Sequence, residues 1–122
     1  MDNKKLKLSL IIPCYNESDN IKLLIDRISK IEYFIDEIIL VNNGSTDTTG
    51  IIAEKLIYGK SNYKLINIEI NVGYGDGIMS GVREASGDII AWTHADLQTD
   101  PQDVIDAFNA YVNYPDFKNS IL

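Results

Sequence analysis

Residues 6–17 of the chain read LKLSLIIPCYNE. The branched apolar residues of 6–12 predict a β-strand, and we expect Pro13 to stop it because proline lacks the N–H that a central strand donates. Residues 17–30 follow with apolar side chains at the spacing of one helical face, and Asn16 is the expected N-cap of that helix. A strand, a short polar loop and an amphipathic helix therefore form the first unit of the chain.

The same order of strand and helix occurs three more times. The further expected strands are residues 35–41, 63–70 and 88–93. The further expected helices are residues 47–58, residues 75–85, and a segment with Asp100 as its cap and Pro101 at its first position. We expect the fourth strand to be buried. Four such units predict an α/β, Rossmann-like fold in which a mostly parallel sheet carries helices on both faces.

Three glycines mark the second and third predicted helices. Gly59 is expected to end the second helix, because glycine readily adopts the left-handed conformation found just past a helix. Gly77 and Gly81 each disfavour the third helix by about 1 kcal/mol relative to alanine. Their spacing of four residues places both on one helical face, which would allow that face to pack closely against the sheet.

The length and composition of the chain fit one domain over residues 1–122, and its charge bears on the ligands that it can bind. Hydrophobic residues make up 45% of the chain, which is enough for one core. The formal net charge is −7 and the basic residues are scattered. This pattern argues against a nucleic-acid-binding surface and against a polybasic membrane patch.

The shortness of the apolar runs and the presence of a single cysteine favour a cytoplasmic location for the chain. No stretch approaches the roughly 20 apolar residues of a transmembrane helix, and the charged start MDNKKLKL lacks the apolar stretch of a signal peptide. Cys14 is the only cysteine, so an internal disulfide is excluded, and with a single histidine the chain lacks the four ligands of a structural zinc site. We expect Cys14 to be a small buried packing residue.

Polar or glycine-rich loops follow all four predicted strands. They read PCYNE (13–17), NNGSTD (42–47), NVGYG (71–75) and HADLQ (94–98). In a parallel sheet, every loop from a strand to a helix lies at the same edge, where such folds bind ligands. We therefore expect a binding site at this edge, and we expect Asp47 to be a cap or first-turn residue of the second helix.

A family resemblance rests on four runs in this order and spacing: IIPCYNE, VNNGSTD, NVGYG and THADLQTDP. They resemble glycosyltransferase family 2 from about Leu8 to Phe108, and most of all its members that attach a sugar to polyprenyl or dolichyl phosphate. The resemblance implies a GT-A fold with strand order 3-2-1-4, a UDP- or GDP-sugar donor, a Mg²⁺ or Mn²⁺ ion and an inverting transfer. The acceptor it implies is a lipid phosphate or a saccharide in cell-envelope glycan synthesis, at the inner face of the membrane for a lipid.

The metal motif of the family is an acidic pair, Asp-x-Asp, often followed by Leu-Gln. Here the run reads His94-Ala95-Asp96, so a histidine replaces the first acid. Asp96 keeps the second position and is the expected metal ligand and donor contact, and Gln98 offers a carbonyl oxygen. His94 is either a metal or phosphate contact or a loop residue that only hydrogen-bonds. An imidazole suits Mn²⁺ better than Mg²⁺.

Further donor contacts are implied by the second and third loops. The pair Asn42-Asn43 lies where family members usually carry Asp-Asp or Asp-Asn, at a position that contacts the base, and the amide of Asn43 can both accept and donate hydrogen bonds. The run Asn43-Gly44 is also a strong turn signal, and both roles can hold at once. Gly73 and Gly75 are expected to let the backbone approach other backbone or the donor.

The loop after the first strand contributes three expected substrate contacts, Pro13, Tyr15 and Glu17. Tyr15 and Glu17 would flank the base or the ribose. Glu17 has an alternative role as an acid in the first turn of the helix, where the helix dipole favours a negative charge.

Family members are substantially longer than this chain. We therefore expect residues 1–122 to be the N-terminal, nucleotide-sugar-binding part of a longer glycosyltransferase, and the final FKNSIL to start another strand. The catalytic residues stay unassigned, because the base is expected beyond Leu122, and membrane association would come only from those regions or from the acceptor. The alternative is a non-catalytic module that binds a nucleotide or a nucleotide sugar.

Overall fold

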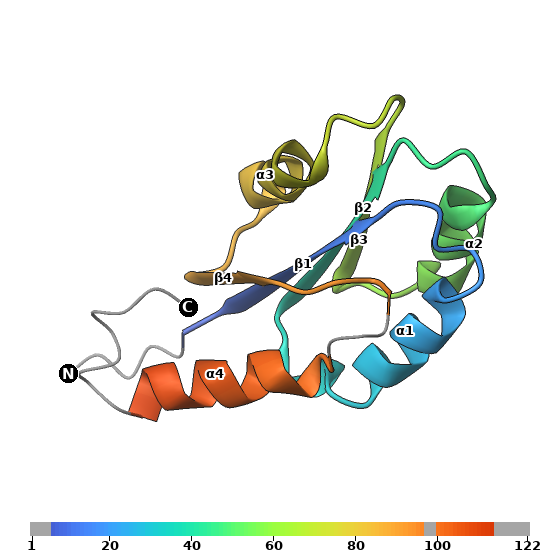
Figure 1. Ribbon diagram of the computed structural model, residues 1–122. Coiled ribbons are helices and arrows are strands. Elements are labelled where there is room, and N and C mark those ends of the chain that lie inside the picture. Colours follow the sequence, from blue (N-terminus) through green and yellow to red (C-terminus); the bar gives the residue numbers. More distant parts are fainter. Residues whose placement is uncertain (1–5, 97–99, 114–122) are drawn as a thin grey trace.

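The computed structural model describes residues 6–96 and 100–113 (Figure 1). Strands and helices alternate along this part of the chain in the order β1 (Leu8–Cys14), α1 (Ile21–Ser29), β2 (Glu37–Asn43), α2 (Thr49–Ile57), β3 (Tyr63–Ile68), α3 (Tyr74–Glu84), β4 (Ile89–Trp92) and α4 (Gln102–Asn113). A single 3₁₀ turn, η1 (Glu32–Phe34), lies between α1 and β2. All the elements predicted within the described residues are present, and Gly59, with φ of 80°, follows α2 as predicted. Their ends differ from the expected ones by at most two residues, except at the start of α1. The strand expected to start in FKNSIL lies outside the described residues.

The four strands form one parallel sheet in the order β3-β2-β1-β4, as the family resemblance implied. β1 lies between two neighbours, since Ile11 aligns with Ile39 of β2 on one side and with Trp92 of β4 on the other. The side chains of residues 8–12 are fully buried. Burial on both faces is typical of a parallel sheet that helices cover on both sides.

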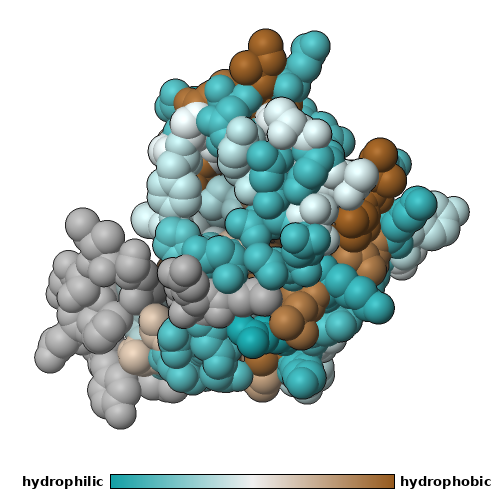
Figure 2. Space-filling view, turned by 45° about the vertical axis from the view of Figure 1, so that its right-hand side comes forward, coloured by the Kyte–Doolittle hydropathy of each residue, from teal (hydrophilic) through white to brown (hydrophobic). Residues whose placement is uncertain are grey.

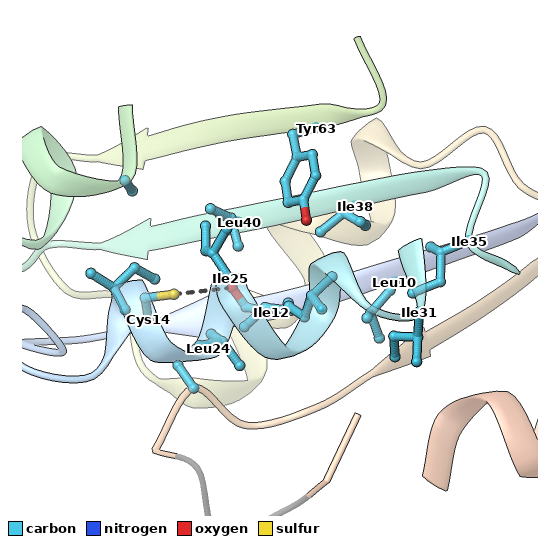
Figure 3. Close-up of a cluster of buried hydrophobic side chains, with 14 of the residues drawn as sticks. Leu10, Ile12, Cys14, Leu24, Ile25, Ile31, Ile35, Ile38, Leu40 and Tyr63 are labelled. Carbon is cyan, nitrogen blue, oxygen red and sulfur yellow. Dashed lines mark hydrogen bonds between the residues drawn. The ribbon is translucent and has the colours of Figure 1, made fainter. Parts of the chain in front are cut away.

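Helices cover both faces of the sheet, as predicted (Figure 1). α3 packs on one face, over Ile11 and Val41, while α1, α2 and α4 lie on the other. Figure 3 shows this second face, where Leu10 of β1 and Leu24 of α1 belong to the same buried cluster. Each branched side chain contributes roughly 1.5–3 kcal/mol when it leaves water, so the larger cluster provides most of the core.

β1 continues through Pro13, so the prediction that this proline ends the strand was wrong. Pro13 aligns with Val41 of β2, whereas the pairing with β4 ends at Ile11 and Trp92. The Ile11 carbonyl accepts a hydrogen bond from the Thr93 N–H (3.1 Å), which shows that Ile11 faces β4. Pro13, two residues on, faces the same side beyond the end of that ladder. Its missing N–H therefore breaks no ladder bond.

The helix α1 begins at Ile21 rather than near Glu17, and Asn16 is not its N-cap. Asn20 holds the cap position, but its side chain makes no capping hydrogen bond to the helix. Glu17 instead closes a turn in which its carbonyl accepts from the N–H groups of Asn20 (2.9 Å) and Ile21 (2.8 Å). The first turn of α1 contains no acid, so the alternative role of Glu17 as a first-turn acid is also wrong.

β4 is only half-buried, which corrects the prediction of a buried strand. Among the strands that the structure describes, it pairs with β1 alone and lies at an edge of the sheet. Trp92, at its end, is 48% exposed. Its apolar run resembles that of a central strand, and the sequence alone did not show that it has one neighbour. In the described part of the chain, no helix has both the length and the apolar character needed to cross a bilayer.

A buried acid, Glu37, organises the opposite, amino-terminal edge of the sheet. Its carboxylate accepts hydrogen bonds from Ser9 Oγ (2.8 Å) and the Ser86 N–H (2.9 Å), and it pairs with Lys64 Nζ at 2.8 Å. Burial would raise the pKa of Glu37, but these partners together hold the pKa below its ordinary value. The network joins β1, β2 and β3 to the end of α3 at the edge away from the predicted site.

α3 lies close to the sheet because two of its glycines face it, as predicted. A Cβ added to Gly81 would lie 2.5 Å from Ile11 Cγ2 and 3.1 Å from Val41 Cγ2. A Cβ added to Gly77 would lie 2.6 Å from Asn43 Nδ2. Such short contacts are not tolerated in a close-packed interior, so the missing side chains set the distance between helix and sheet.

We predict that Gly81→Ala destabilises the fold, although alanine is the better helix former by about 1 kcal/mol. The added methyl group must displace the buried Ile11 side chain, and such overpacking costs about 1–3 kcal/mol. Gly75→Ala is the matched control within α3, because no described atom beyond its own helix and chain neighbours lies within 4 Å of the added Cβ. Chemical denaturation should show a loss of unfolding free energy for Gly81→Ala and none for Gly75→Ala. Equal stability of Gly81→Ala and the wild type would show that α3 moves away from the sheet without loss.

Candidate functional site

The loops that follow the four strands meet at one edge of the sheet, as predicted, and form a cavity of about 270 Å³. Its lining comes from the ends of β1 and β2, from the connections after β1, β3 and β4, and from the first residue of α3: Pro13, Cys14, Tyr15, Glu17, Asn43, Asn71, Tyr74, His94, Ala95 and Asp96. Open parallel sheets bind their ligands at this edge. The volume is slightly below the roughly 300–1,000 Å³ of typical small-molecule pockets, so a ligand as large as a nucleotide sugar would extend over the rim.

Asn16 joins the β1–α1 loop to the β2–α2 loop. Its Oδ1 accepts hydrogen bonds from the backbone N–H groups of Thr46 (2.8 Å) and Asp47 (3.3 Å). Its own backbone N–H donates to Ser45 Oγ (3.0 Å). The backbone of Asn16 is left-handed, with φ of 53°, a conformation that asparagine tolerates better than most residues. These bonds hold the two loops as one unit.

Asp47 adds a second link between these loops. It precedes Thr48, the N-cap of α2, so the prediction that Asp47 is a cap or first-turn residue was wrong, although its carboxylate accepts from the first N–H of the helix. Its Oδ1 accepts from the backbone N–H of Thr49 (2.9 Å) and from the Thr49 hydroxyl, and its Oδ2 accepts from the Ser18 N–H (3.2 Å). Thr49 Oγ1 in turn accepts from the Glu17 N–H (2.8 Å). The hydrogen bond from the Thr49 hydroxyl outweighs desolvation and, with the backbone bonds, lowers the pKa of Asp47 to about 2.

Asn43 holds the β3–α3 loop. Its side chain is 3% exposed, its Nδ2 donates to the Gly73 carbonyl (2.9 Å), and its Oδ1 accepts from the Val72 N–H (3.0 Å). Asn71 completes the arrangement, because its Nδ2 donates to the Asn43 carbonyl (3.0 Å) and its Oδ1 accepts from the Gly73 N–H (2.8 Å). Gly73 has φ of 93°, which favours glycine. Side-chain amides therefore fix the shape of this loop.

An aromatic pair connects the third and fourth loops. The rings of Tyr74 and His94 are stacked, with centroids 5.5 Å apart and 11° between their planes. The Tyr74 hydroxyl lies 3.2 Å from His94 Nδ1. Burial, and then the nearby charge of Asp96, raises the pKa of Tyr74 above its ordinary value, so the hydroxyl stays protonated at neutral pH. The pair forms a wall of the cavity.

Two exposed aromatic side chains line the cavity, and an exposed apolar side chain lies in the connection between β3 and α3. Tyr15 and Tyr74 are 49% and 51% exposed, and Ile70, just after β3, is 75% exposed. Figure 2 shows hydrophobic atoms at the upper tip of the molecule, where Figure 1 places the connection between β3 and α3, above a largely hydrophilic surface. Exposed rings at a rim can stack on a planar group of a ligand.

The cavity brings together most of the predicted site residues. Those that line it are Pro13, Tyr15, Glu17, Asn43, His94 and Asp96. Gly73 and Gly75 lie in the β3–α3 loop and in the first turn of α3. A Cβ added to either glycine would have no described atom of another segment within 4 Å. Close packing against another segment is therefore not the reason for a glycine at these two positions. Their approach to a donor stays a prediction, and Gln98 lies outside the described residues.

Three residues of the site went unpredicted: Tyr74, Asn71 and, in its role between loops, Asn16. Tyr74 carried a usable signal, because a large aromatic between two glycines at a ligand-binding edge has little reason to be buried. Asn71 and Asn16 carried none, since each binds backbone groups about 30 positions away.

The lining of the cavity is acidic. Among its described residues are two carboxylates, Glu17 and Asp96, and neither a lysine nor an arginine. Burial, and then the charge of Glu17, raises the pKa of the Cys14 thiol to about 12. Cys14 is therefore neutral and buried, a packing residue as predicted and not a nucleophile. A polyanionic ligand in this cavity would need a cation beside it.

We predict that Asp47 makes the stability of the chain fall in acid between about pH 4 and pH 2. Its pKa is 3.8 in the unfolded reference and about 2 in the folded chain. Its stabilising contribution is therefore complete above the unfolded pKa and is lost as the pH falls through the folded pKa. Thermal unfolding of the wild type and of Asp47→Asn should differ at pH 7 and converge at pH 2.

The control is Asp19→Asn, which removes an exposed carboxylate from the β1–α1 connection. It should match the wild type at both pH values. Titration of Glu37 is common to all three proteins and cancels from the differences. A constant difference between Asp47→Asn and the wild type from pH 7 to pH 2 would contradict the proposed link.

Comparison with known proteins identifies relatives along most of the chain. The family model described as Glycosyl transferase family 2 matches residues 9–116. The chain is 32% identical over 106 residues to a dodecaprenyl-phosphate galacturonate synthase of Rhizobium johnstonii. It is 36% identical over 102 residues to an undecaprenyl-phosphate 4-deoxy-4-formamido-L-arabinose transferase of Yersinia pestis. These matches cover 83% and 80% of this chain but only 31% of each relative, so the chain spans about a third of their length.

Solved structures share the fold. The chain is similar to residues 1–349 of S. aureus TarS in complex with UDP-GlcNAc, with a TM-score of 0.74 and 27% identity over 90% of this chain and 32% of that TarS chain. It is also similar to the glucosyl-3-phosphoglycerate synthase of Mycobacterium tuberculosis in complex with Mn²⁺, UDP and phosphoglyceric acid. That match has a TM-score of 0.72 and 25% identity over 88% of this chain and 39% of the synthase.

The match to the family model leaves only the two ends of the chain uncovered. The strand order and the position of the cavity agree with the resemblance that the four loop motifs carry. This chain has the GT-A fold and belongs to glycosyltransferase family 2.

Proposed function

We propose that this chain is the donor-binding part of an inverting glycosyltransferase that uses a UDP- or GDP-sugar. The observation that carries the proposal is the cavity at the carboxyl edge of the sheet, which combines exposed aromatic rings with Asp96 and His94 from one loop. Rings suit a base or a sugar, while a carboxylate and an imidazole suit a metal-bound diphosphate. The UDP-GlcNAc complex of TarS and the polyprenyl-phosphate relatives support it.

The base and ribose would lie on the side formed by the β1–α1 loop. Tyr15 offers an exposed ring there, Pro13 an apolar surface, and Glu17 a carboxylate that can accept hydrogen bonds from ribose hydroxyls. The Glu17 side chain is oriented by Asn20, whose Nδ2 donates to Glu17 Oε2 (3.0 Å). A direct base contact of Asn43 stays a prediction, with one N–H and one lone pair of its amide left over from the loop contacts.

A divalent cation fits this cavity. Among the described residues, no three His, Cys, Asp or Glu side chains lie close enough to hold a metal ion without other ligands. Mg²⁺ at nucleotide sites is commonly held by one or two carboxylates together with substrate phosphates. Asp96 would supply such a carboxylate, and His94 would supply a nitrogen ligand that suits Mn²⁺ better than Mg²⁺. When bound, the ion would stabilise charge on the departing nucleoside diphosphate as a Lewis acid. The related synthase crystallised with Mn²⁺ and UDP supports this, and Gln98 as a third ligand stays a prediction.

We propose a polyprenyl phosphate or a saccharide as the acceptor, in cell-envelope glycan synthesis. The polyprenyl-phosphate relatives support the lipid phosphate. A phosphate acceptor is already anionic and needs little help from a base, whereas a sugar hydroxyl needs general-base catalysis. The base and the acceptor site would lie in the parts of such enzymes that these 122 residues do not cover. A cytoplasmic location, at the inner face of the membrane for a lipid acceptor, stays a prediction.

A second candidate function follows from His94. Because it replaces the first acid of the metal motif, the chain fits a non-catalytic module that binds a nucleotide or a nucleotide sugar. Both functions require donor binding, so binding alone does not separate them. Sugar transfer from the bound donor to polyprenyl phosphate by a longer form of the protein would exclude the non-catalytic module.

We predict that the chain binds a UDP- or GDP-sugar more tightly with Mn²⁺ than without metal, and that Asp96→Asn removes this gain. Asp96 is the carboxylate of the metal motif, so its loss should lower the metal-dependent affinity by at least the roughly 10- to 100-fold that the loss of an outer-shell partner costs. His94→Asp should keep the metal effect but shift preference from Mn²⁺ towards Mg²⁺, because it exchanges a nitrogen ligand for an oxygen ligand. Calorimetry with each nucleotide sugar, with and without each metal, measures both effects.

Asp19→Asn is the matched control, because it removes the same charge from an exposed side chain outside the cavity lining. It should bind the donor as the wild type does. NAD is the control ligand. Equal affinity for NAD, no binding of any nucleotide sugar, or an intact metal effect in Asp96→Asn would contradict the proposed function.

A further inference from the structure

The geometry points to Asn43 as a positioning residue, which acts on the donor by fixing the β3–α3 loop and not by contacting the base. The inference deepens the proposed function and rests on it for the identity of the donor. The loop contacts of Asn43 stand independently of any ligand.

The Asn43 amide is already engaged by the loop. It donates through Nδ2 to the Gly73 carbonyl and accepts through Oδ1 from the Val72 N–H, at 2.9 and 3.0 Å. One bond needs a donor and the other needs an acceptor, so an amide satisfies both and an ionised acid does not. With 3% of its surface exposed, the residue has little area left for a ligand.

The helix α3 encloses the same amide from another side. A Cβ added to Gly77 would lie 2.6 Å from Asn43 Nδ2, so the first turns of α3 reach the amide only because this residue is glycine. The Asn43 carbonyl is covered as well, since it accepts from Asn71 Nδ2 at 3.0 Å. The end of β2, the β3–α3 loop and α3 therefore meet around one side chain.

The loop that Asn43 fixes leads directly to the wall of the cavity. Residues 71–73 precede Tyr74, whose ring is stacked on His94. Loss of the Asn43 contacts would free this turn and displace Tyr74 from His94. This wall of the cavity is the same whichever base is bound. If Asn43 only positions the wall, loss of its contacts should therefore lower the affinities for UDP and GDP by the same factor. A residue that contacts the base would instead change their ratio.

Asn43→Asp tests the inference. Aspartate has nearly the same size and keeps an acceptor for the Val72 N–H, but its second oxygen would face the Gly73 carbonyl and cannot donate when ionised. In the ligand-free chain, we expect hydrogen exchange of the Val72 and Gly73 amides to quicken about tenfold. The affinities for UDP and GDP should both fall about tenfold, with their ratio unchanged.

A spectroscopic signature distinguishes the positioning role from a general loss of stability. In nuclear magnetic resonance spectra, the ring protons of His94 should be shifted by the stacked Tyr74 ring. In Asn43→Asp, these signals should move towards their positions in Tyr74→Leu. Exchange of the amides of β1 and the start of β2 should stay as slow as in the wild type.

Asn67→Asp is the matched control. Asn67 Oδ1 accepts from Asn42 Nδ2 (3.0 Å), a contact that aspartate can keep, so the loop amides and the His94 signals should not change. If Asn43→Asp does not fold, Asn71→Asp gives the same measurements, because it removes the bond to the Asn43 carbonyl and keeps the acceptor for Gly73. It should quicken the same two amides.

Two results would overturn the inference: unchanged loop exchange and His94 signals in the folded variant, or a changed ratio of UDP to GDP affinity with an intact loop. Failure of the wild type to bind any nucleotide would count against the proposed function alone. The exchange and resonance measurements need no nucleotide, so they still decide the role of Asn43 in the loop.

Discussion

The parallel pairing of β1 with both β2 and β4 is the constraint on which the site depends. Because the neighbouring strands run in one direction, their backbone hydrogen bonds bring all four carboxyl ends to the same edge. Each connection must then return across a face of the sheet as a helix, which leaves the loops after the strands side by side. Residues as distant in the sequence as Pro13 and Asp96 line one cavity for this reason.

The two faces of the sheet are covered in different ways. α1, α2 and α4 pack through branched side chains, and the resulting cluster forms most of the core (Figure 3). α3 packs through Gly77 and Gly81, which brings its backbone close to β1 and β2. The beginning of α3 therefore lies beside the end of β2, and the loop before it comes within hydrogen-bonding reach of Asn43. The low helix propensity of the two glycines is offset by this placement.

The spacing of apolar residues and glycines along the chain predicted the features that depend only on nearby residues. Strands, helices, the buried face of α1 and the glycine face of α3 follow from periodicity, whereas the strand order came from the family resemblance. The predictions failed where distant contacts decide. Pro13 stays in β1 because β4 ends before reaching it, and Asn16 binds Thr46, 30 positions away, instead of capping α1. Such contacts join loops of different units, and no short pattern in the sequence records them.

The two asparagines at the end of β2 show that a sequence motif cannot be interpreted fully without the residues that contact it in the fold. The family resemblance suggests Asp-Asp or Asp-Asn here, so the pair departs from the family pattern at its first position. In the structure, Asn43 donates to the Gly73 carbonyl, and Asn42 donates to Asn67 Oδ1 on the side of α2.

Each of these two amides lies against a helix glycine. A Cβ added to Gly77 would lie 2.6 Å from Asn43 Nδ2, and a Cβ added to Gly50 would lie 2.5 Å from Asn42 Nδ2. An ionised acid donates no hydrogen bond, so at position 43 it would place a negative oxygen against a carbonyl. The amide at position 43 is therefore explained by the loop and helix packed around it, before any ligand is considered.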